Sequence, residues 1–274
     1  MTRVCKRLLF ALAGAGTVLS TYAHANLFTV SPLEHTYQAT LTHQPQLAWQ
    51  ELFLALRQNE ISSKYWVPIK NELLSQTACG TELSSGKKLT SQLTLGVIRR
   101  FGLTSQGYQI RLSVEQYTKN QSVTLTSPNG VALLKGNLIA NPQYQEIESI
   151  DLLQKPVSGI YTLSLGNQKI DLLIAIPEGA PWLSLENKEG HRTVETTLPS
   201  SVSSCPKAMA TWQWFDKNYN LLGSTIPFTH SLEGIPKQPF TEDKAEHLTA
   251  SVELVEFQNG VQIEYIQRLA IPYR

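Results

Sequence analysis

The sequence contains little charge, and neither sign is in strong excess. Only 16% of its 274 residues are charged, and the 23 Lys and Arg residues nearly balance the 22 Asp and Glu residues. The longest basic clusters are dipeptides such as Arg99-Arg100. A nucleic-acid-binding protein concentrates Lys and Arg on one face or segment. Nucleic acid is therefore not an expected partner.

Long hydrophobic runs are missing after the N-terminus. Residues 1–25 have a basic start, the apolar stretch "LLFALAGAGTVL" and the ending Ala23-His24-Ala25, which is the pattern of a cleavable signal peptide. A membrane-spanning helix needs roughly 20 apolar residues, more than this stretch provides. We therefore interpret residues 1–25 as a signal peptide for export to the periplasm, with secretion as the alternative, and we expect no membrane span.

Cysteine is also scarce. After removal of the signal peptide only Cys79 and Cys205 remain, and the compartment they reach is oxidising. This favours one structural disulfide between them, while free buried thiols and an intermolecular bridge are the alternatives. For a loop of this length the chain-entropy model gives roughly 5 kcal/mol of stabilisation.

The common catalytic and metal-binding motifs are missing as well. The sequence has no Gly-x-Ser-x-Gly and no His-Glu-x-x-His, and no two histidines after residue 25 lie within four residues of each other. Asp216 begins a loop with calcium-type spacing, but Leu221 and Pro227 stand where that motif needs Gly and Glu. We predict no catalytic residue, no metal and no cofactor, and retain Asp216 only as a candidate binding residue.

Residues 26–80 have helical periodicity. The segment "PQLAWQELFLALRQ" places apolar residues at spacings of three and four, and with the preceding "SPLEHTYQATLTHQ" it predicts a short helical hairpin broken at Pro45. A third, weaker helix is expected over "SSKYWVPIKNELLSQ", limited or kinked at Pro68. Trp49, Phe53 and Trp66 are candidate binding residues, because an exposed apolar patch on them would receive a partner protein.

The remaining sequence has the period-two alternation of β-strands. Segment "YQIRLSVE" places Tyr108, Ile110, Leu112 and Val114 on one face and polar residues on the other. We expect one antiparallel sandwich over residues 81–178, a boundary at "PEGAPW", and a second sandwich over 179–274 with a two-residue hairpin turn at Asn259-Gly260. The predicted fold class is α+β, mainly β: a helical hairpin followed by two immunoglobulin-like β-sandwich domains.

Two tryptophans at alternate positions, Trp212 and Trp214, point to the same side of a predicted strand. They are expected either to pack in the core or to form an exposed aromatic platform for a sugar ring. The second alternative makes a glycan a candidate partner and these two residues candidate binding residues.

The segment "SPLEHTYQATLTHQPQLAWQELFLALRQ" resembles an exported family of vibrio-type gammaproteobacteria, a domain of unknown function with the number 2861. The resemblance implies a periplasmic setting and transfers no catalytic residue. We therefore expect a non-enzymatic periplasmic envelope protein that acts as a protein-binding or accessory module. The alternatives are a module that binds peptidoglycan or another glycan, and a hydrolase whose site is dispersed along the sequence.

Overall fold

A computed structural model describes residues 31–83, 92–102, 106–141, 143–188, 191–238 and 245–271. The predicted signal peptide lies outside these residues. The chain divides into Met1–Ser31 and one compact unit, Pro32–Arg274, and the description below concerns the second. No helix among the described residues is long and apolar enough to cross a membrane.

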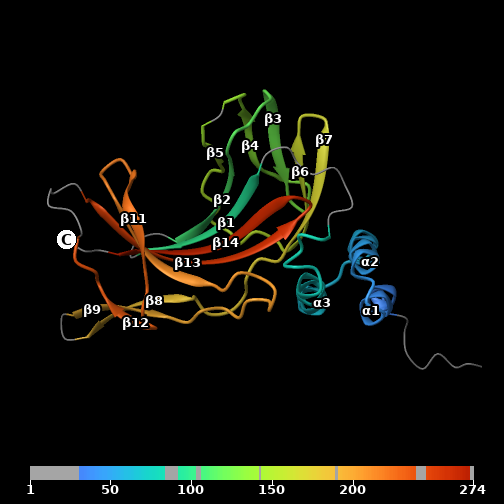
Figure 1. The fold of residues 1–274 in the computed structure, drawn as a ribbon, viewed down its shortest axis with the longest axis horizontal. Helices are drawn as coiled ribbons and strands as arrows, with labels where there is room; N and C mark the ends of the chain where they lie inside the picture. Colours follow the sequence, from blue (N-terminus) through green and yellow to red (C-terminus); the bar gives the residue numbers. More distant parts are fainter. Residues whose placement is uncertain are drawn as a thin grey trace, which may run out of the picture. The chain divides into compact units, whose positions relative to one another are not determined.

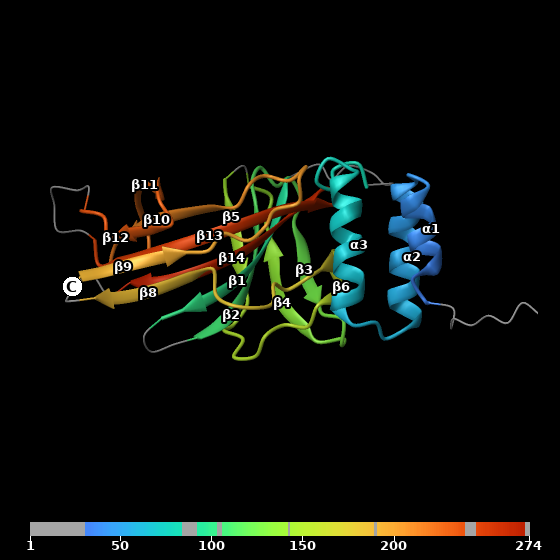
Figure 2. The same ribbon diagram turned by 90° about the horizontal axis from the view of Figure 1, so that it is seen from below.

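Three helices open the compact unit: α1 (Glu34–Leu41), α2 (Pro45–Gln58) and α3 (Ser63–Ser75). Figures 1 and 2 show them gathered beside β6. Pro45 occupies the first turn of α2, where an α-helix makes no use of its N–H group. Pro68 lies inside α3 and does not end it, because the helix continues to Ser75.

The largest sheet has seven strands. In spatial order these are β11 (Leu221–Pro227), β10 (Met209–Phe215), β13 (His247–Gln258), β14 (Val261–Ile271), β1 (Leu93–Phe101), β2 (Gln106–Val114) and β5 (Gln145–Glu148). Neighbouring strands are antiparallel except β1 and β14, which pair in parallel from Leu93 opposite Val261 to Phe101 opposite Leu269.

Two smaller antiparallel sheets complete the fold (Figure 1). The four-stranded sheet has the order β4 (Ala132–Leu138), β3 (Gln121–Thr126), β6 (Gly159–Leu165) and β7 (Gln168–Ile174). The three-stranded sheet has the order β12 (Leu232–Gly234), β9 (His191–Thr196) and β8 (Leu183–Lys188). The chain is therefore mainly β, with three sheets.

The predicted boundary between residues 178 and 179 falls in the connection from β7 to β8, but it does not separate the sheets. Strands β1, β2 and β5 come before it and β10, β11, β13 and β14 after it, and all seven lie in one sheet. Proline and glycine interrupt a strand period in any long connection, whether or not a domain ends there. The ranges 81–178 and 179–274 therefore share a sheet, and the immunoglobulin-like assignment of each stays a prediction.

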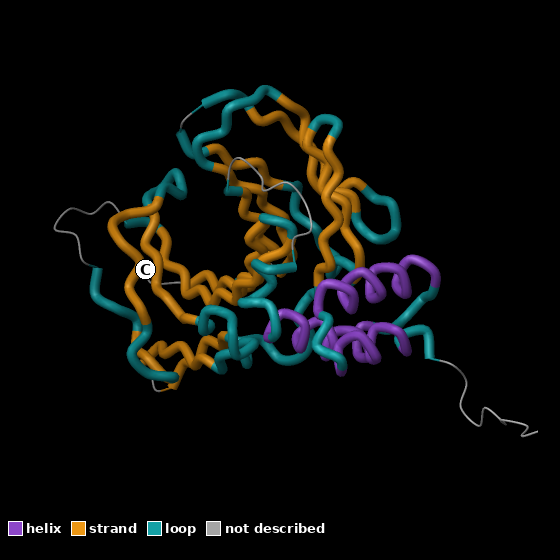
Figure 3. Tube along the Cα trace, turned by 45° about the vertical axis from the view of Figure 1, so that its right-hand side comes forward, coloured by secondary structure: helices purple, strands orange, loops and turns teal. Residues whose placement is uncertain are grey.

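One main core contains side chains from all three sheets, among them Leu163 of β6, Val194 of β9 and Ile263 of β14, each without measurable exposure. A second, smaller core lies under the helices and includes Trp66 and Leu173. Strand β7 contributes to both, because alternate residues of a strand point to opposite faces. The four-stranded sheet thus carries the helices on one face and the main core on the other (Figure 3).

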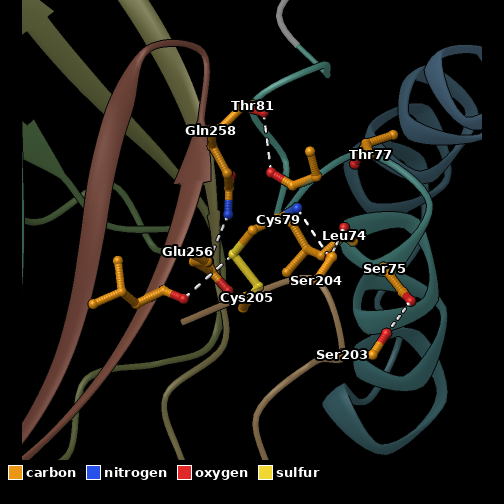
Figure 4. Close-up of a disulfide and its surroundings, with 12 residues drawn as sticks. Leu74, Ser75, Thr77, Cys79, Thr81, Ser203, Ser204, Cys205, Glu256 and Gln258 are labelled. Carbon is orange, nitrogen blue, oxygen red and sulfur yellow. Dashed lines mark hydrogen bonds between the residues drawn. A yellow bond between two sulfur atoms is a disulfide. The ribbon is translucent and has the colours of Figure 1, made fainter. Parts of the chain in front are cut away.

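The predicted disulfide is confirmed: Cys79 and Cys205 are bonded, with their Cα atoms 4.7 Å apart. Figure 4 shows the bond between the end of α3 and the segment that precedes β10. The Ser204 hydroxyl accepts a hydrogen bond from the Cys79 backbone N–H (3.0 Å) and donates one to the Leu74 carbonyl (2.8 Å). The Phe257 N–H donates to the Cys79 carbonyl, so this clip also fastens the end of α3 to β13.

A buried ion pair holds α3 against the large sheet. The Lys70 Nζ lies 2.7 Å from both carboxylate oxygens of Glu256 on β13, and the Tyr265 hydroxyl donates to the same carboxylate (3.0 Å). Gln258 also donates to that carboxylate (2.8 Å). Burial lowers the pKa of Lys70, and the attraction of Glu256 opposes the shift. Because the carboxylate is paired and hydrogen-bonded, the charges are compensated without water.

The predicted turn at Asn259-Gly260 is confirmed. Strand β13 ends at Gln258, β14 begins at Val261, and these two residues are register partners. Both turn residues have positive φ, 50° for Asn259 and 78° for Gly260, as a type I′ turn requires. This turn places Gln258 and Asn259 beside β7, where both contribute to the candidate site.

Candidate functional site

A groove of about 610 Å³ lies between helix α2 and strand β7. Helix α2 contributes one wall, β7 the other, and Leu83 and Asn259 complete the lining. The helical wall consists of Gln46, Trp49, Gln50, Glu51, Phe53, Leu54 and Arg57. The strand wall consists of Gln168, Lys169, Ile170 and Asp171. The groove therefore combines apolar side chains with the edge of a β-sheet.

Strand β7 is an edge strand, and part of its edge is already occupied. The Gln258 side-chain amide accepts from the Leu173 N–H (2.7 Å) and donates to the Leu173 carbonyl (2.9 Å), as a neighbouring strand would. The Asn259 amide donates to the Asp171 carbonyl (2.9 Å). The backbone N–H and C=O groups that point away from β6 thus belong to every second residue of β7. These residues are Leu173, Asp171 and, next along the strand, Lys169.

The edge remains unpaired where it borders the groove. Within the part of the chain that the structure describes, no hydrogen bond outside the β6–β7 ladder involves the backbone N–H or C=O of Lys169 or the N–H of Asp171. Such groups are a template for pairing with another extended chain. The groove therefore offers two donors and one acceptor beside an apolar wall.

An ion pair between Arg57 and Asp171 crosses the groove from α2 to β7. The guanidinium also lies 5.9 Å from the centre of the Phe53 ring. Asp171 accepts a further hydrogen bond from the Thr162 hydroxyl (2.7 Å). Since the Arg57 side chain is 56% exposed, this pair orients the two walls more than it stabilises the fold.

The structure brings together two of the predicted binding residues and separates the rest. Trp49 and Phe53 line the groove and contact each other edge to face, with ring centres 5.3 Å apart. Their rings are largely buried, so they form the floor of the groove and no exposed patch. Trp66 is buried within the second core and does not line the groove.

Neither Trp212 nor Trp214 presents a ring to solvent, since both are buried in the main core. Trp212 stacks on Phe228 with ring centres 4.5 Å apart, and its indole N–H donates to Glu233 (3.2 Å). Burial alone would raise the pKa of the Glu233 carboxyl. The hydrogen bonds that it accepts from Thr229, His230 and Trp212 outweigh the effect of burial and lower the pKa to about 2. Trp212 and Trp214 therefore belong to the main core and form no exposed aromatic platform.

Asp216 is occupied by its own loop. Its carboxylate accepts hydrogen bonds from the Asn218 N–H (2.7 Å), the Asn220 N–H (2.9 Å) and the Asn220 amide (2.9 Å). This is the local turn that Asp and Asn favour. Among the described residues there is also no group of three or more His, Cys, Asp or Glu side chains that could hold a metal ion.

Sequence reasoning missed the strand wall of the groove. Lys169 and Asp171 belong to a segment that reads correctly as a strand, but its position at a sheet edge depends on strand order. The sequence predicts Asn259 only as a turn residue, whereas the hydrogen bond that its amide makes to β7 spans 88 residues. The alternation of apolar and polar residues predicts neither the edge position of β7 nor this hydrogen bond.

Comparison with known proteins adds a family and a distant structural likeness. No curated protein matches the sequence. Among solved structures, the chain is similar to "Biofilm associated protein - BSP domain", with 14% identity over 65% of this chain and a TM-score of 0.22. The aligned region spans 29% of that protein's chain. The model of the protein family of unknown function DUF2861 matches residues 27–274, so the chain belongs to that family.

Proposed function

We propose that this chain is a non-enzymatic periplasmic envelope protein whose α2–β7 groove binds an extended segment of a partner protein. The observation that carries the proposal is the short unpaired edge of β7, at Lys169 and Asp171, beside the apolar wall of α2. Backbone groups at a sheet edge give affinity to any extended peptide, and adjacent side chains give specificity.

The side chains that line the groove indicate which kind of peptide segment would bind there. Trp49 and Phe53 form the floor, and Leu54 is 47% exposed, so the segment should carry at least one apolar side chain toward α2. Because Gln258 and Asn259 cover the edge beyond Asp171, only a short segment pairs with β7. The periplasmic setting rests on the predicted signal peptide and is supported by the disulfide.

A proline substitution tests strand pairing directly. Panning the oxidised mature chain against a displayed random peptide library selects ligands, whose affinities are then measured for wild type, Lys169→Pro and Lys169→Ala. Proline removes the backbone N–H of residue 169, which faces away from the ladder, while alanine removes the side chain and keeps that N–H. We expect Lys169→Pro to weaken binding about tenfold, and Lys169→Ala to weaken it less than about threefold.

Two results would contradict the proposal. Selected peptides that bind both variants equally well do not use the backbone of β7. Peptides whose binding is insensitive to Leu54→Asp do not lie in the groove, because that substitution places a charge on its apolar wall.

A further inference from the structure

The seven-stranded sheet has one face toward the main core and an opposite face, called here the polar face, that carries Gln109, Arg111 and Ser113. Polar residues on such a face are ordinarily exposed. Here Gln109 and Ser113 are buried, as is Ser251 of β13. Parts of the polar face are therefore buried.

Four side chains at one end of the polar face are adjacent across three strands. Gln213 of β10 is the register partner of Thr249 on β13, and Ser251 is the partner of Arg268 on β14. Directly paired residues share a face with Cβ atoms about 5 Å apart, and Thr249 and Ser251 are neighbours along one strand face. Together the four residues form a continuous cluster, called here the Arg268 cluster.

Every member of the Arg268 cluster has a buried polar atom without a partner among the described residues. These atoms are Gln213 Oε1, Thr249 Oγ1, Ser251 Oγ and Arg268 Nε. Buried side-chain polar atoms in folded proteins are almost always hydrogen-bonded, so four adjacent exceptions require an explanation. Ala270, the partner of Thr249, is exposed beside them.

Arg268 also lies beside other cations and makes no direct ion pair among the described residues. Arg100 is its register partner on the parallel strand β1, and like charges directly opposite each other destabilise a sheet. Arg100 bonds to Asp151, and Arg111 pairs with Glu146 and Glu264.

By contrast, no carboxylate of the described residues lies within 4.0 Å of the Arg268 guanidinium. Burial, and then repulsion by Arg111 and Arg100, lowers the pKa of Arg268, while attraction by the more distant Glu148 and Glu146 opposes the shift only in part. An anion at this position would compensate both the burial and the repulsion.

We propose that the Arg268 cluster binds a carboxylate-bearing, hydroxyl-rich ligand, the chemistry of an acidic sugar. The planar guanidinium matches a carboxylate with two parallel hydrogen bonds. The hydroxyls of Ser251 and Thr249 and the amide of Gln213 can accept from or donate to ring hydroxyls on the same ligand. This site lies on the large sheet and is independent of the α2–β7 groove.

Calorimetry with simple probes tests the ligand class. D-glucuronate carries both a carboxylate and ring hydroxyls, whereas acetate carries only the carboxylate and D-glucose only the hydroxyls. We expect glucuronate to bind the oxidised mature chain at least about tenfold more tightly than either of the others, a difference of about 1.4 kcal/mol. Arg268→Gln and Ser251→Ala should each weaken glucuronate binding, the first by about tenfold or more, while Arg57→Gln in the groove leaves it unchanged. Equal binding of all three probes, or no binding of glucuronate, overturns the proposal.

Thermal unfolding without ligand provides a second readout. If Arg268 is unpaired and opposed by Arg100, Arg268→Gln keeps or raises the melting temperature, because it removes a repulsion and no bond. A fall of several degrees would mean that Arg268 is paired in solution, which overturns the proposal. Neither experiment involves the peptides selected by the groove, so failure here leaves the proposed function intact.

Discussion

Replacing Lys70 by methionine would leave the Glu256 carboxylate buried without its cation. The Lys70 and Glu256 side chains are 1% and 8% exposed, and the carboxylate retains only neutral donors from Tyr265 and Gln258. Removing one partner of a buried ion pair typically costs about 3–5 kcal/mol. We therefore expect Lys70→Met to lower the free energy of unfolding by that amount.

The double variant Lys70→Met/Glu256→Gln separates the charge from the packing. It has no buried charge, so most of the loss should be recovered, to within about 1–2 kcal/mol of wild type. Urea unfolding of the oxidised chain, followed by circular dichroism, measures both, and Lys64→Met at an exposed position of the same helix is the control. A loss below about 1 kcal/mol in Lys70→Met, or no recovery in the double variant, refutes the reasoning.

Three further predictions concern stability. Cys79→Ser/Cys205→Ser should lower the free energy of unfolding by about 5 kcal/mol or less, since the disulfide spans 126 positions; an unchanged urea midpoint would exclude a stabilising disulfide. Gly80→Ala should cost more than about 2 kcal/mol, because φ is +89° and a Cβ would meet the Phe257 carbonyl oxygen at 2.0 Å; a wild-type melting temperature would contradict this. The pKa of Glu233 is lowered to about 2 from an ordinary value of 4.5, so its stabilisation is complete above the ordinary value and is lost as pH falls toward 2. Allowing for solvent, Glu233→Gln should remove about 1–2 kcal/mol near neutral pH and much less at pH 2, as urea titrations at the two pH values would show.

Local signals predicted the local structure well. The segment Pro45–Gln58 forms α2 as expected, because its apolar spacing matches one face of a helix. Strand β2 buries Tyr108, Ile110, Leu112 and Val114 as the alternation requires. The turn at residues 259–260 follows from the conformations that Asn and Gly tolerate.

Long-range pairing could not be predicted in the same way. The parallel pairing of β1 with β14 joins segments that lie more than 160 residues apart, and neither segment encodes its partner. The buried Lys70 illustrates the same limit, since a lysine on a helix is ordinarily exposed and its compensating carboxylate lies 186 residues away. The groove depends on such pairings, because the order of strands decides that β7 is an edge.

The burial of Trp49 makes it unsuitable for testing the groove by substitution. Truncating a buried tryptophan costs about 3–5 kcal/mol, so Trp49→Ala would disturb the second core as well as the groove. Leu54 and Lys169 line the groove without this complication, since Leu54 is exposed and Lys169 lies at a sheet edge.

Amide hydrogen exchange at Lys169 and Asp171 tests the central claim most directly. The oxidised chain is measured by NMR with and without a selected peptide at saturation. If the peptide adds to β7, both N–H groups acquire acceptors and their exchange slows by about tenfold or more, while exchange at the Leu173 N–H, already bonded to Gln258, changes little. Unchanged exchange at Lys169 and Asp171 in the saturated complex would show that the groove does not bind its partner through this edge.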